Sequence, residues 1–361
     1  MTPSVLFIQK RTHRAGAQTC LARLLRHAGM KQWNPVVVCS APGWLTGECE
    51  QNGIPFIIEP FPSSRSLGAR LIGNRSWAKA VQHQLKARNL QPTIVHANDH
   101  LEGLLGLALG KELKARSAIF LRSPGMRRED LFKYDCPKYD FIAVVGDELL
   151  ARNQAWKPDL KLKLIHDGIE TGEFMPVKPK AETFPKRILV VGSALDWKGW
   201  ADLTEALYLL QRKDQLPELT FDFTGDKPDP AKNDLKLERL RIGQYNFIGR
   251  VEKFRDLVRS YDLVINATRM ESFGMAAVEV LAAGVPLLTS RTGIIEQVQE
   301  DTRFLFTPKQ PKELAERLHN LIKTWTEMNM SIDQAQANIR SKFTVDIAMQ
   351  KLAAEYQALC S

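Results

Sequence analysis

The sequence has few cysteines, no long apolar run and no internal repeat, and each absence excludes a class of protein. The five cysteines are odd in number and include no C-x-x-C pair, so neither a disulfide framework nor a zinc cluster is indicated. No apolar stretch approaches the roughly 18–20 residues that a membrane span needs, and the N-terminus lacks a signal-peptide core. A protein of the reducing cytoplasm is therefore expected.

Several catalytic motifs are also missing. The chain contains no G-x-S-x-G, no Walker A sequence and no complete G-x-G-x-x-G, so hydrolase and dinucleotide oxidoreductase functions lose support. His96 and His100 lie four residues apart but outside an H-E-x-x-H pattern. We interpret them as loop residues and expect no metal site.

Charge is distributed unevenly along the 361 residues, whose length fits two domains. Residues 1–170 hold 24 Lys and Arg against 15 Asp and Glu, whereas residues 171–361 hold 26 of each. A one-sided basic surface favours an anionic partner such as a phosphorylated glycan or anionic lipid headgroups, or else is a solvated face. Nucleic acid is disfavoured because the bases are not interleaved with stacking aromatics.

Apolar runs alternate with amphipathic helical stretches along the whole chain, which is typical of parallel α/β sheets. The first half predicts strands at Val5–Gln9, Pro35–Cys39, Thr93–His96, Ser117–Leu121 and Phe141–Val145, with helices over Ala17–His27 and Leu101–Leu113. The second half predicts strands at Arg187–Val191, Leu219–Thr224, Asn246–Ile248, Asp262–Ala267 and Pro286–Leu288. Two doubly wound domains, joined by a Met175–Pro185 linker, would place a ligand cleft between two sheets.

The segment at residues 262–290 carries the most chemical information. Glu271 follows a buried strand, and Phe273, Gly274 and Met275 open a helix whose N–H groups form an anion site. Glu279 is the only polar side chain in the apolar run that follows, so we expect it to be buried and to need a partner such as a ribose diol. Alternatively, Ser272 caps the helix and Glu279 pairs with Arg250 or Arg269.

These residues carry a resemblance to a known family. ESFGMAAVE, with seven residues between its glutamates, resembles the E-x7-E motif of retaining glycosyltransferases of family 4 and their GT-B relatives. FIGRV, FTGD, VVGSALDWKG and LAAGVPLLTS are similar to further motifs of that family, in the expected order. HDGIETGEF resembles its domain junction, and FTVDIAMQKLAAEY resembles its last helix.

The resemblance implies a GT-B fold, in which two Rossmann-like doubly wound domains face each other across a cleft. The expected N-terminal, acceptor-side domain covers residues 1–172 together with a C-terminal helix at 345–361 that packs back on it. The expected nucleotide-sugar donor domain covers residues 173–344.

The same resemblance assigns roles to individual residues. Glu279 would hold the ribose hydroxyls and Glu271 would contact the donor sugar, while Lys198 would neutralise the diphosphate as it leaves. Further donor-binding positions implied by the motifs are Phe273, Gly274, Met275, Gly16, Arg250 and Val251. Because Lys198 and helix amides suffice to neutralise the diphosphate, we expect no metal and no cofactor.

The chain departs from the family pattern at two positions. Gly192–Ser193 stands where relatives have an arginine that accompanies the lysine, and Arg250, Arg269 or Arg291 is a candidate replacement. Arg122 stands at about the position of a histidine near the reacting sugar carbon, and we expect it to bind the donor diphosphate or an acidic acceptor group.

The function that the resemblance implies is retaining transfer of a sugar from a UDP- or GDP-linked donor to a hydroxyl of a glycan. The basic, amphipathic segment Ser66–Leu90 favours an anionic, lipid-linked acceptor and a peripheral position on the inner membrane face, as in lipopolysaccharide core or surface polysaccharide synthesis. Alternatively, that segment is a helix packed on its own domain. The alternative functions are a GT-B nucleotide-sugar epimerase and a non-catalytic glycan- or anion-binding module.

Overall fold

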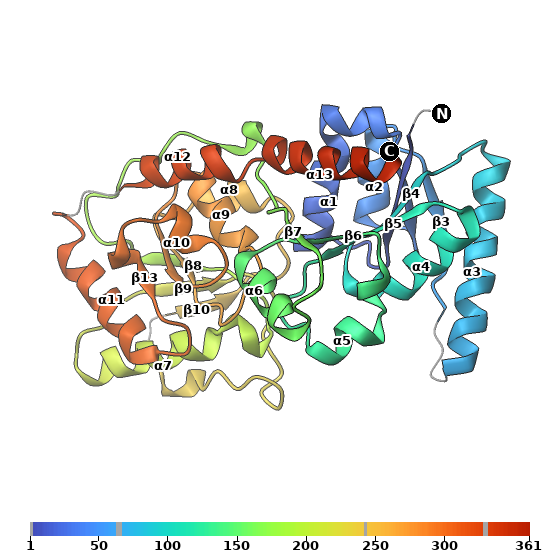
Figure 1. Ribbon diagram of the computed structural model, residues 1–361. Helices are drawn as coiled ribbons and strands as arrows, with labels where there is room; N and C mark the ends of the chain where they lie inside the picture. Colours follow the sequence, from blue (N-terminus) through green and yellow to red (C-terminus); the bar gives the residue numbers. More distant parts are fainter. Residues whose placement is uncertain (1–2, 63–66, 242–243, 328–330) are drawn as a thin grey trace. The chain divides into compact units, whose positions relative to one another are not determined.

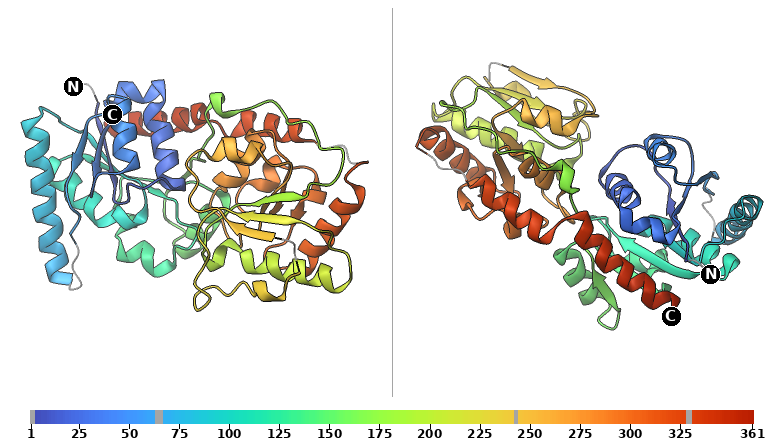
Figure 2. Two further views of the ribbon diagram at one scale, coloured as in Figure 1. Left: turned by 180° about the vertical axis from the view of Figure 1, so that it is seen from behind. Right: turned by 90° about the horizontal axis from the view of Figure 1, so that it is seen from above.

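The computed structural model describes residues 3–62, 67–241, 244–327 and 331–361. The chain divides into two compact units, one formed by Met1–Gly168 with Phe343–Ser361 and the other by Ile169–Lys342. Each unit has a parallel β-sheet with helices on both faces (Figures 1 and 2). The α/β fold class expected from the alternating pattern is thus confirmed.

The sheet of the first unit has seven parallel strands in the order β3-β2-β1-β4-β5-β6-β7. The strands are β1 (Val5–Gln9), β2 (Val36–Cys39), β3 (Phe56–Ile58), β4 (Ile94–Ala97), β5 (Arg116–Leu121), β6 (Phe141–Val144) and β7 (Leu162–Leu164). Strand order reverses between β1 and β4, which places a crevice beyond the carboxyl ends of these two neighbours.

Helices bury both faces of this sheet, which explains why its central strands are continuous apolar runs. Val5 and Phe7 of β1 face one core, and Leu6 and Ile8 face the other. The first core receives α1 (Gly16–Arg26), α2 (Trp44–Gln51), α5 (Arg128–Lys133) and α6 (Asp147–Trp156). The second receives α3 (Leu67–Ala87) and α4 (Gly103–Leu113), which follows the short 3-10 turn η2 (His100–Glu102).

The last helix, α13 (Val345–Cys360), belongs to the first unit and packs against α1 and η1 (Ala28–Trp33). The hydroxyl of Tyr356 lies 2.5 Å from Nδ1 of His96 on β4. Just before the helix, Thr344 passes so close to Gly168 that a Cβ on this glycine would lie 2.3 Å from the Thr344 carbonyl carbon. The C-terminus is therefore an integral part of the first core.

The sheet of the second unit has six parallel strands in the order β10-β9-β8-β11-β12-β13. They are β8 (Arg187–Val190), β9 (Thr220–Phe223), β10 (Gln244–Phe247), β11 (Val264–Asn266), β12 (Leu287–Ser290) and β13 (Leu305–Phe306). The helices are α7 (Trp200–Arg212), α8 (Phe254–Arg259), α9 (Met275–Ala282), α10 (Ile295–Val298), α11 (Pro311–Thr324) and α12 (Ile332–Lys342). The strand order of this second sheet reverses between β8 and β11.

The sequence prediction missed the three strands β3, β7 and β13, and all three are sheet edges of two or three residues. Segments as short as these carry too few residues for a recognisable pattern. The expected Met175–Pro185 linker is wrong, because this stretch lies inside the second unit. Its backbone is bonded there: Met175 N–H donates to the Ala282 carbonyl at 2.9 Å and Lys178 N–H to the Gly284 carbonyl at 2.8 Å.

Candidate active site

The candidate site lies in the second unit, at the carboxyl ends of the neighbouring strands β8 and β11. The loop after β8 contains Lys198 and leads into α7, and the loop after β11 contains Glu271 and leads into α9. Ligands of open α/β sheets bind at such a reversal of strand order. The two loops that the sequence singled out are therefore brought together by the sheet itself.

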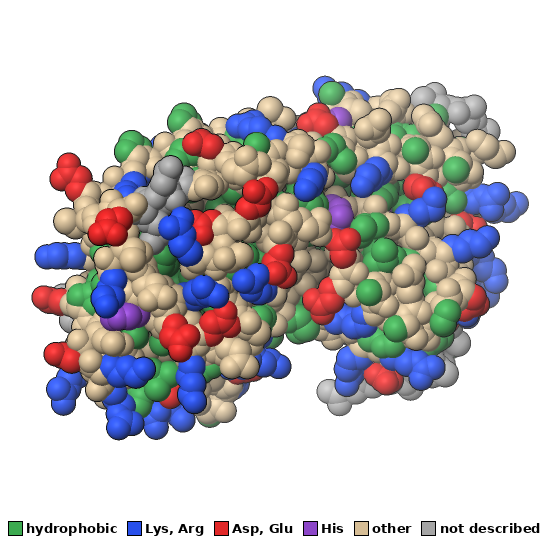
Figure 3. Space-filling view, turned by 60° about the vertical axis from the view of Figure 1, so that its left-hand side comes forward, with side chains coloured by type: hydrophobic (Ala, Val, Ile, Leu, Met, Phe, Trp, Pro, Cys, Tyr) green, Lys and Arg blue, Asp and Glu red, His purple; other side chains and the backbone are tan. Residues whose placement is uncertain are grey.

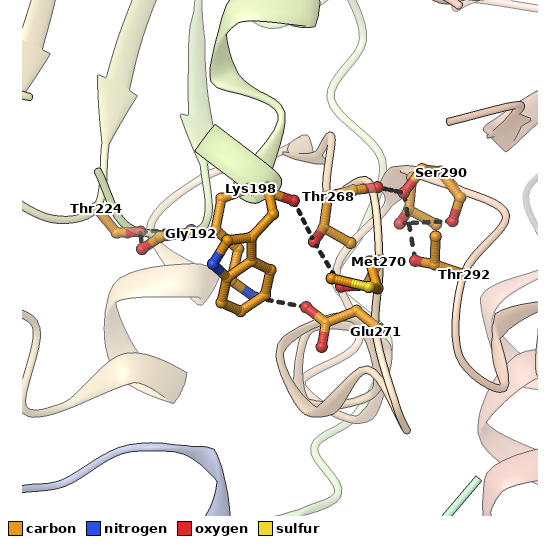
Figure 4. A network of polar contacts seen from close by, with 10 residues as sticks. Gly192, Lys198, Thr224, Thr268, Met270, Glu271, Ser290 and Thr292 are labelled. Atoms are coloured by element: carbon orange, nitrogen blue, oxygen red, sulfur yellow. Dashed lines mark hydrogen bonds and ion pairs between the residues drawn. The ribbon is translucent and has the colours of Figure 1, made fainter. Parts of the chain in front are cut away.

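Lys198 and Glu271 form an ion pair, with Nζ 2.5 Å from Oε1 (Figure 4). Their side chains are 17% and 15% exposed, so the pair is partly desolvated while one side of it still meets solvent. The Lys198 ammonium also lies 4.2 Å from the centroid of the Trp197 ring. A fixed cation beside a carboxylate suits a ligand that carries both an anionic group and hydroxyl donors.

Backbone constraints hold the loop that carries Lys198. Gly199 has φ +69°, and a Cβ there would lie 1.8 Å from the Ala267 carbonyl oxygen at the end of β11. Thr268 Oγ1 and Arg269 N–H both donate to the Trp197 carbonyl, at 3.3 Å and 2.8 Å. The two loops are consequently in direct contact, and only glycine fits at position 199.

Helix α9 starts at Met275 after Gly274, which has φ +94° and left-handed geometry. The N-cap residue of this helix is Gly274, which has no side chain that could cap it, and the capping role suggested for Ser272 stays a prediction. The positive end of the helix dipole therefore points out of Phe273–Gly274–Met275, as an anion site requires.

Glu279 lies on α9, one turn after Met275, and its side chain is only half-buried. The expectation of full burial is wrong. The helix is apolar in sequence, but its surface at position 279 is only partly covered. A half-buried carboxylate needs a partner less than a fully buried one does. The contact of Glu279 with the ribose hydroxyls therefore stays a prediction.

Arg269 and Arg291, both considered as replacements at the phosphate site, are paired with acids. Arg269 Nε and Nη2 each donate to Asp202 at 2.7 Å, and Nη1 lies 2.9 Å from both Asp196 oxygens. These hydrogen bonds, to Asp202 above all, raise the pKa of Arg269. Arg291 pairs with Glu296 at 2.6 Å. Arg250 is exposed in the loop after β10, next to the half-buried Val251.

In the first unit, Gly16 opens α1 in open space, since a Cβ there would meet nothing within 4 Å. Arg122, which follows β5, is 6% exposed. Its Nη1 donates to Asp167 and its Nε donates to Asn98 Oδ1 at 3.1 Å, while the guanidinium stacks 4.2 Å above the Phe120 ring. Arg122 is thus built into the carboxyl edge of the sheet, and its expected contact with an anionic ligand stays a prediction.

Sequence reasoning missed a polar cluster at the same edge, formed by Asp99, His100 and Glu102. Asp99 accepts hydrogen bonds from His100 N–H at 2.8 Å, Arg122 N–H at 3.1 Å and Ser123 Oγ. Burial opposes ionisation of Asp99, but its hydrogen bonds with the His100 ring, whose Nδ1 lies at 2.9 Å, with Ser123 and with the Arg122 N–H lower its pKa. The signal was present in the HANDH segment, residues 96–100, which spans the end of β4 and was judged only for metal ligation.

Glu102 is 3% exposed, and one of its oxygens accepts the Lys10 N–H at 3.1 Å. Its other oxygen, Oε2, is buried without a hydrogen-bond partner among the described residues. Burial, and secondarily the charge of Asp99, raise the pKa of Glu102 to about 7. Among the residues that the structure describes, no group of three or more His, Cys, Asp or Glu is arranged to hold a metal ion.

Comparisons with known proteins connect this geometry to a family. Residues 185–324 match the family model "Glycosyl transferases group 1". The chain is 26% identical over 205 residues to an uncharacterised glycosyltransferase of Methanocaldococcus jannaschii, 52% of each protein, and 27% identical over 223 residues to a glycogen synthase of Mycobacterium tuberculosis. The latter match covers 57% of this chain and 54% of the synthase, so the chain spans about half the length of the curated relatives.

Solved structures match over nearly the full chain. Anabaena HepE, in complex with UDP and glucose, has a TM-score of 0.80 at 18% identity and covers 99% of this chain and 100% of its own. The glycosyltransferase of Rickettsia africae has a TM-score of 0.77 at 16% identity, with 100% and 99% coverage. The lipopolysaccharide outer core galactosyltransferase WaaB has a TM-score of 0.70 at 16% identity, with 97% and 98% coverage.

No helix in the described parts of the chain is long and apolar enough to cross a bilayer. The parallel six- and seven-stranded sheets and the structural matches establish the two Rossmann-like units of a GT-B fold. The region that matches the group 1 glycosyl transferase model, residues 185–324, holds both Lys198 and Glu271.

Proposed function

We propose that this protein is a retaining glycosyltransferase that moves a sugar from a UDP- or GDP-linked donor to a hydroxyl of a glycan. The observation that carries the proposal is the Lys198–Glu271 pair at the strand-order reversal of a group 1 glycosyltransferase domain. The solved complex of HepE with UDP-glucose, similar over 98% of this chain, supports a uridine nucleotide as donor.

In this proposal the donor diphosphate lies between Lys198 and the start of α9. The ammonium and the helix dipole stabilise the negative charge that grows on the diphosphate as it leaves. The bond from the anomeric carbon to the phosphate oxygen breaks while a bond to the acceptor oxygen forms on the same face. The acceptor proton passes to the departing phosphate oxygen, so the chain needs no covalent nucleophile and no metal.

Glu271 and Glu279 act as hydroxyl acceptors in the same scheme. Glu271, which Lys198 holds in place, contacts hydroxyls of the donor sugar, and Glu279 contacts the ribose. Glu279 is half-buried on α9, so part of its surface reaches solvent. This accessibility supports a ligand-binding role better than a core role.

The acceptor is proposed to be an anionic, lipid-linked glycan, as in lipopolysaccharide core or surface polysaccharide synthesis. The similarity to WaaB supports the first of these. Between Glu59 and Asp99 the chain has no acidic residue and six basic ones: Arg65, Arg70, Arg75, Lys79, Lys86 and Arg88. A surface of this charge attracts anionic lipid at about 1 kcal/mol per base.

Helix α3 presents part of this charge to solvent. Trp77, Val81 and Leu85 face the core, and the exposed positions on the other side include Arg75, Lys79 and Lys86, with Ile72 71% exposed near the start. The predicted positions Arg65 and Ser66 lie outside the described residues, as do the side chains of Leu67, Arg70 and Leu71. The face in Figure 3, in contrast, shows basic and acidic side chains interspersed.

Two measurements test the proposal. Thermal shift with UDP, GDP and their sugars, with and without EDTA, should show a metal-independent rise in midpoint with one donor family, because a ligand of the folded state stabilises it. Silence across the panel favours the binding-module alternative. A new sugar product formed from donor alone favours the epimerase alternative, whereas the proposal requires an acceptor.

Membrane association is tested separately by sedimentation with anionic vesicles. The chain should bind at low salt and be released above a few hundred millimolar salt, because surface charge attraction is screened. Binding that ignores salt, or no binding at low salt, contradicts the membrane part of the proposal without affecting the donor part.

A further inference from the structure

Arg269 bridges two carboxylates that lie on either side of Lys198 in the sequence. Asp202 in the first turn of α7 receives a two-bond fork from Nε and Nη2, each at 2.7 Å. Asp196, two residues before Lys198, lies 2.9 Å from Nη1 through both of its oxygens. The side chains of Arg269 and Asp202 are 19% and 11% exposed, and that of Asp196 is 66% exposed.

All three nitrogens of the Arg269 guanidinium are therefore occupied by acids. A phosphate would have to displace a bidentate carboxylate to reach it, and such pairs are among the strongest charge-assisted hydrogen bonds. This geometry argues against Arg269 as the replacement for the arginine missing at Gly192–Ser193. It also leaves two carboxylates, those of Asp196 and Asp202, close to a site that is proposed to bind an anionic diphosphate.

We infer that Arg269 is a positioning residue that holds Asp196 and Asp202 and offsets one of their two negative charges, so that Lys198 can bind a nucleoside diphosphate. The inference rests on the proposed function. Without Arg269, two uncompensated carboxylates within four residues of Lys198 would repel the diphosphate and compete with it for the ammonium. The same bridge joins the loop after β11 to the start of α7.

Arg269 has a second role, because it also holds together the two loops that carry Lys198 and Glu271. Arg269 is two residues before Glu271, and its N–H donates to the Trp197 carbonyl at 2.8 Å, next to Lys198. The guanidinium and the backbone N–H of one residue thus connect the two loops that supply Lys198 and Glu271. Asp202 gains in addition from its place at the positive end of α7.

The test measures UDP and GDP binding by titration calorimetry at about 20 mM and about 500 mM salt. Arg269→Met should weaken binding of the preferred nucleotide about tenfold at low salt, and the loss should shrink at high salt, because repulsion between partly exposed charges is screened. Adding Asp196→Asn and Asp202→Asn to this variant should restore affinity to within about threefold of that of the unaltered chain or better, because both repelling carboxylate charges are then removed.

Arg187→Met is the matched control. Arg187 pairs with the buried Asp222 at the other end of the same sheet, with Nη2 2.5 Å from Oδ2, so its loss should lower stability and leave nucleotide affinity unchanged. Arg269→Lys, which retains the charge, covers the case in which Arg269→Met does not fold. It should keep most of the affinity.

Each outcome decides the matter. Unchanged affinity in Arg269→Met overturns the inference, as does a triple variant that binds as weakly as Arg269→Met at both salt concentrations. If the unaltered chain binds neither UDP nor GDP, the proposed function fails first. That failure is distinguishable from a failure of the inference about Arg269, because it is seen with the unaltered chain alone.

Discussion

Lys198 and Glu271, 73 positions apart in the sequence, form a direct ion pair, with Nζ 2.5 Å from Oε1. Each residue belongs to a loop at the carboxyl end of a neighbouring parallel strand, so the pair is a consequence of strand order. An ammonium that is paired with one carboxylate can still donate hydrogen bonds to a second anion on its solvent side. The first prediction concerns this cation.

Lys198→Ala should lower kcat by about 10²–10³-fold, because it removes a charge that stabilises the leaving diphosphate in the transition state. The effect on KM for the donor should be smaller. Steady-state kinetics with saturating acceptor measures both constants. Lys232→Ala is the control, since that lysine side chain is 83% exposed in the same unit, and it should change neither constant. An unchanged kcat in Lys198→Ala would contradict the assigned site.

Glu279→Ala should weaken nucleotide binding about tenfold, because it removes a carboxylate that accepts hydrogen bonds from the ribose hydroxyls. Calorimetric titration with the preferred nucleoside diphosphate gives the affinity directly. Glu316→Ala, at an exposed position of α11 in the same unit, should bind like the unaltered chain. If the two variants bind nucleotide equally well, Glu279 does not contact the ribose.

Glu102 should make stability depend on pH. Its pKa in the fold is about 7, above the value of 4.5 that it has when exposed, so the folded state binds more protons between these values. Stability from this group is therefore fully present below about pH 4.5 and is lost as the pH rises to about 7, with a change on the order of 3 kcal/mol. Urea unfolding at several pH values measures the slope.

Glu102→Gln preserves the shape of this side chain and its acceptor for the Lys10 N–H, but cannot ionise. The variant should therefore be more stable than the unaltered chain at pH 8 and close to it at pH 4.5. A constant stability difference between the two chains across this range would show that Glu102 does not titrate near neutrality.

The glycines at the starts of α7 and α1 should respond in opposite ways to alanine. At Gly199 a Cβ would lie 1.8 Å from the Ala267 carbonyl oxygen and φ is +69°, so Gly199→Ala should cost about 3 kcal/mol or more. At Gly16 nothing lies within 4 Å, so Gly16→Ala should raise stability by about 0.5–1 kcal/mol.

Nucleotide affinity tells whether position 16 is a glycine because a phosphate approaches its backbone or only because it lies at a helix start. If a phosphate approaches this backbone, Gly16→Ala should bind nucleotide more weakly although it is more stable. Equal affinity would leave Gly16 as an ordinary helix-start residue. Thermal unfolding with and without the nucleotide measures both effects on one sample.

The central strands and the motif positions were predictable from the sequence because their causes are local. A strand such as Val5–Gln9 is buried on both faces and so is apolar from Val5 to Ile8, and its residues match β1. Glu271 and Lys198 were identified from short motifs, and the neighbouring strands β8 and β11 then brought them together. The edge strands β3, β7 and β13 were not predictable, since two or three residues show no periodicity.

Only the tertiary structure decided which charges are paired. Arg269 was a candidate phosphate ligand in the sequence, yet it is bound by Asp202, 67 positions away, and Arg122 is bound by Asp167, 45 positions away. Tyr356 reaches His96 across 260 positions. Composition and periodicity specify which segments become strands and helices. Long-range pairs depend instead on which loops strand order brings to the same edge, and that is a property of the whole sheet.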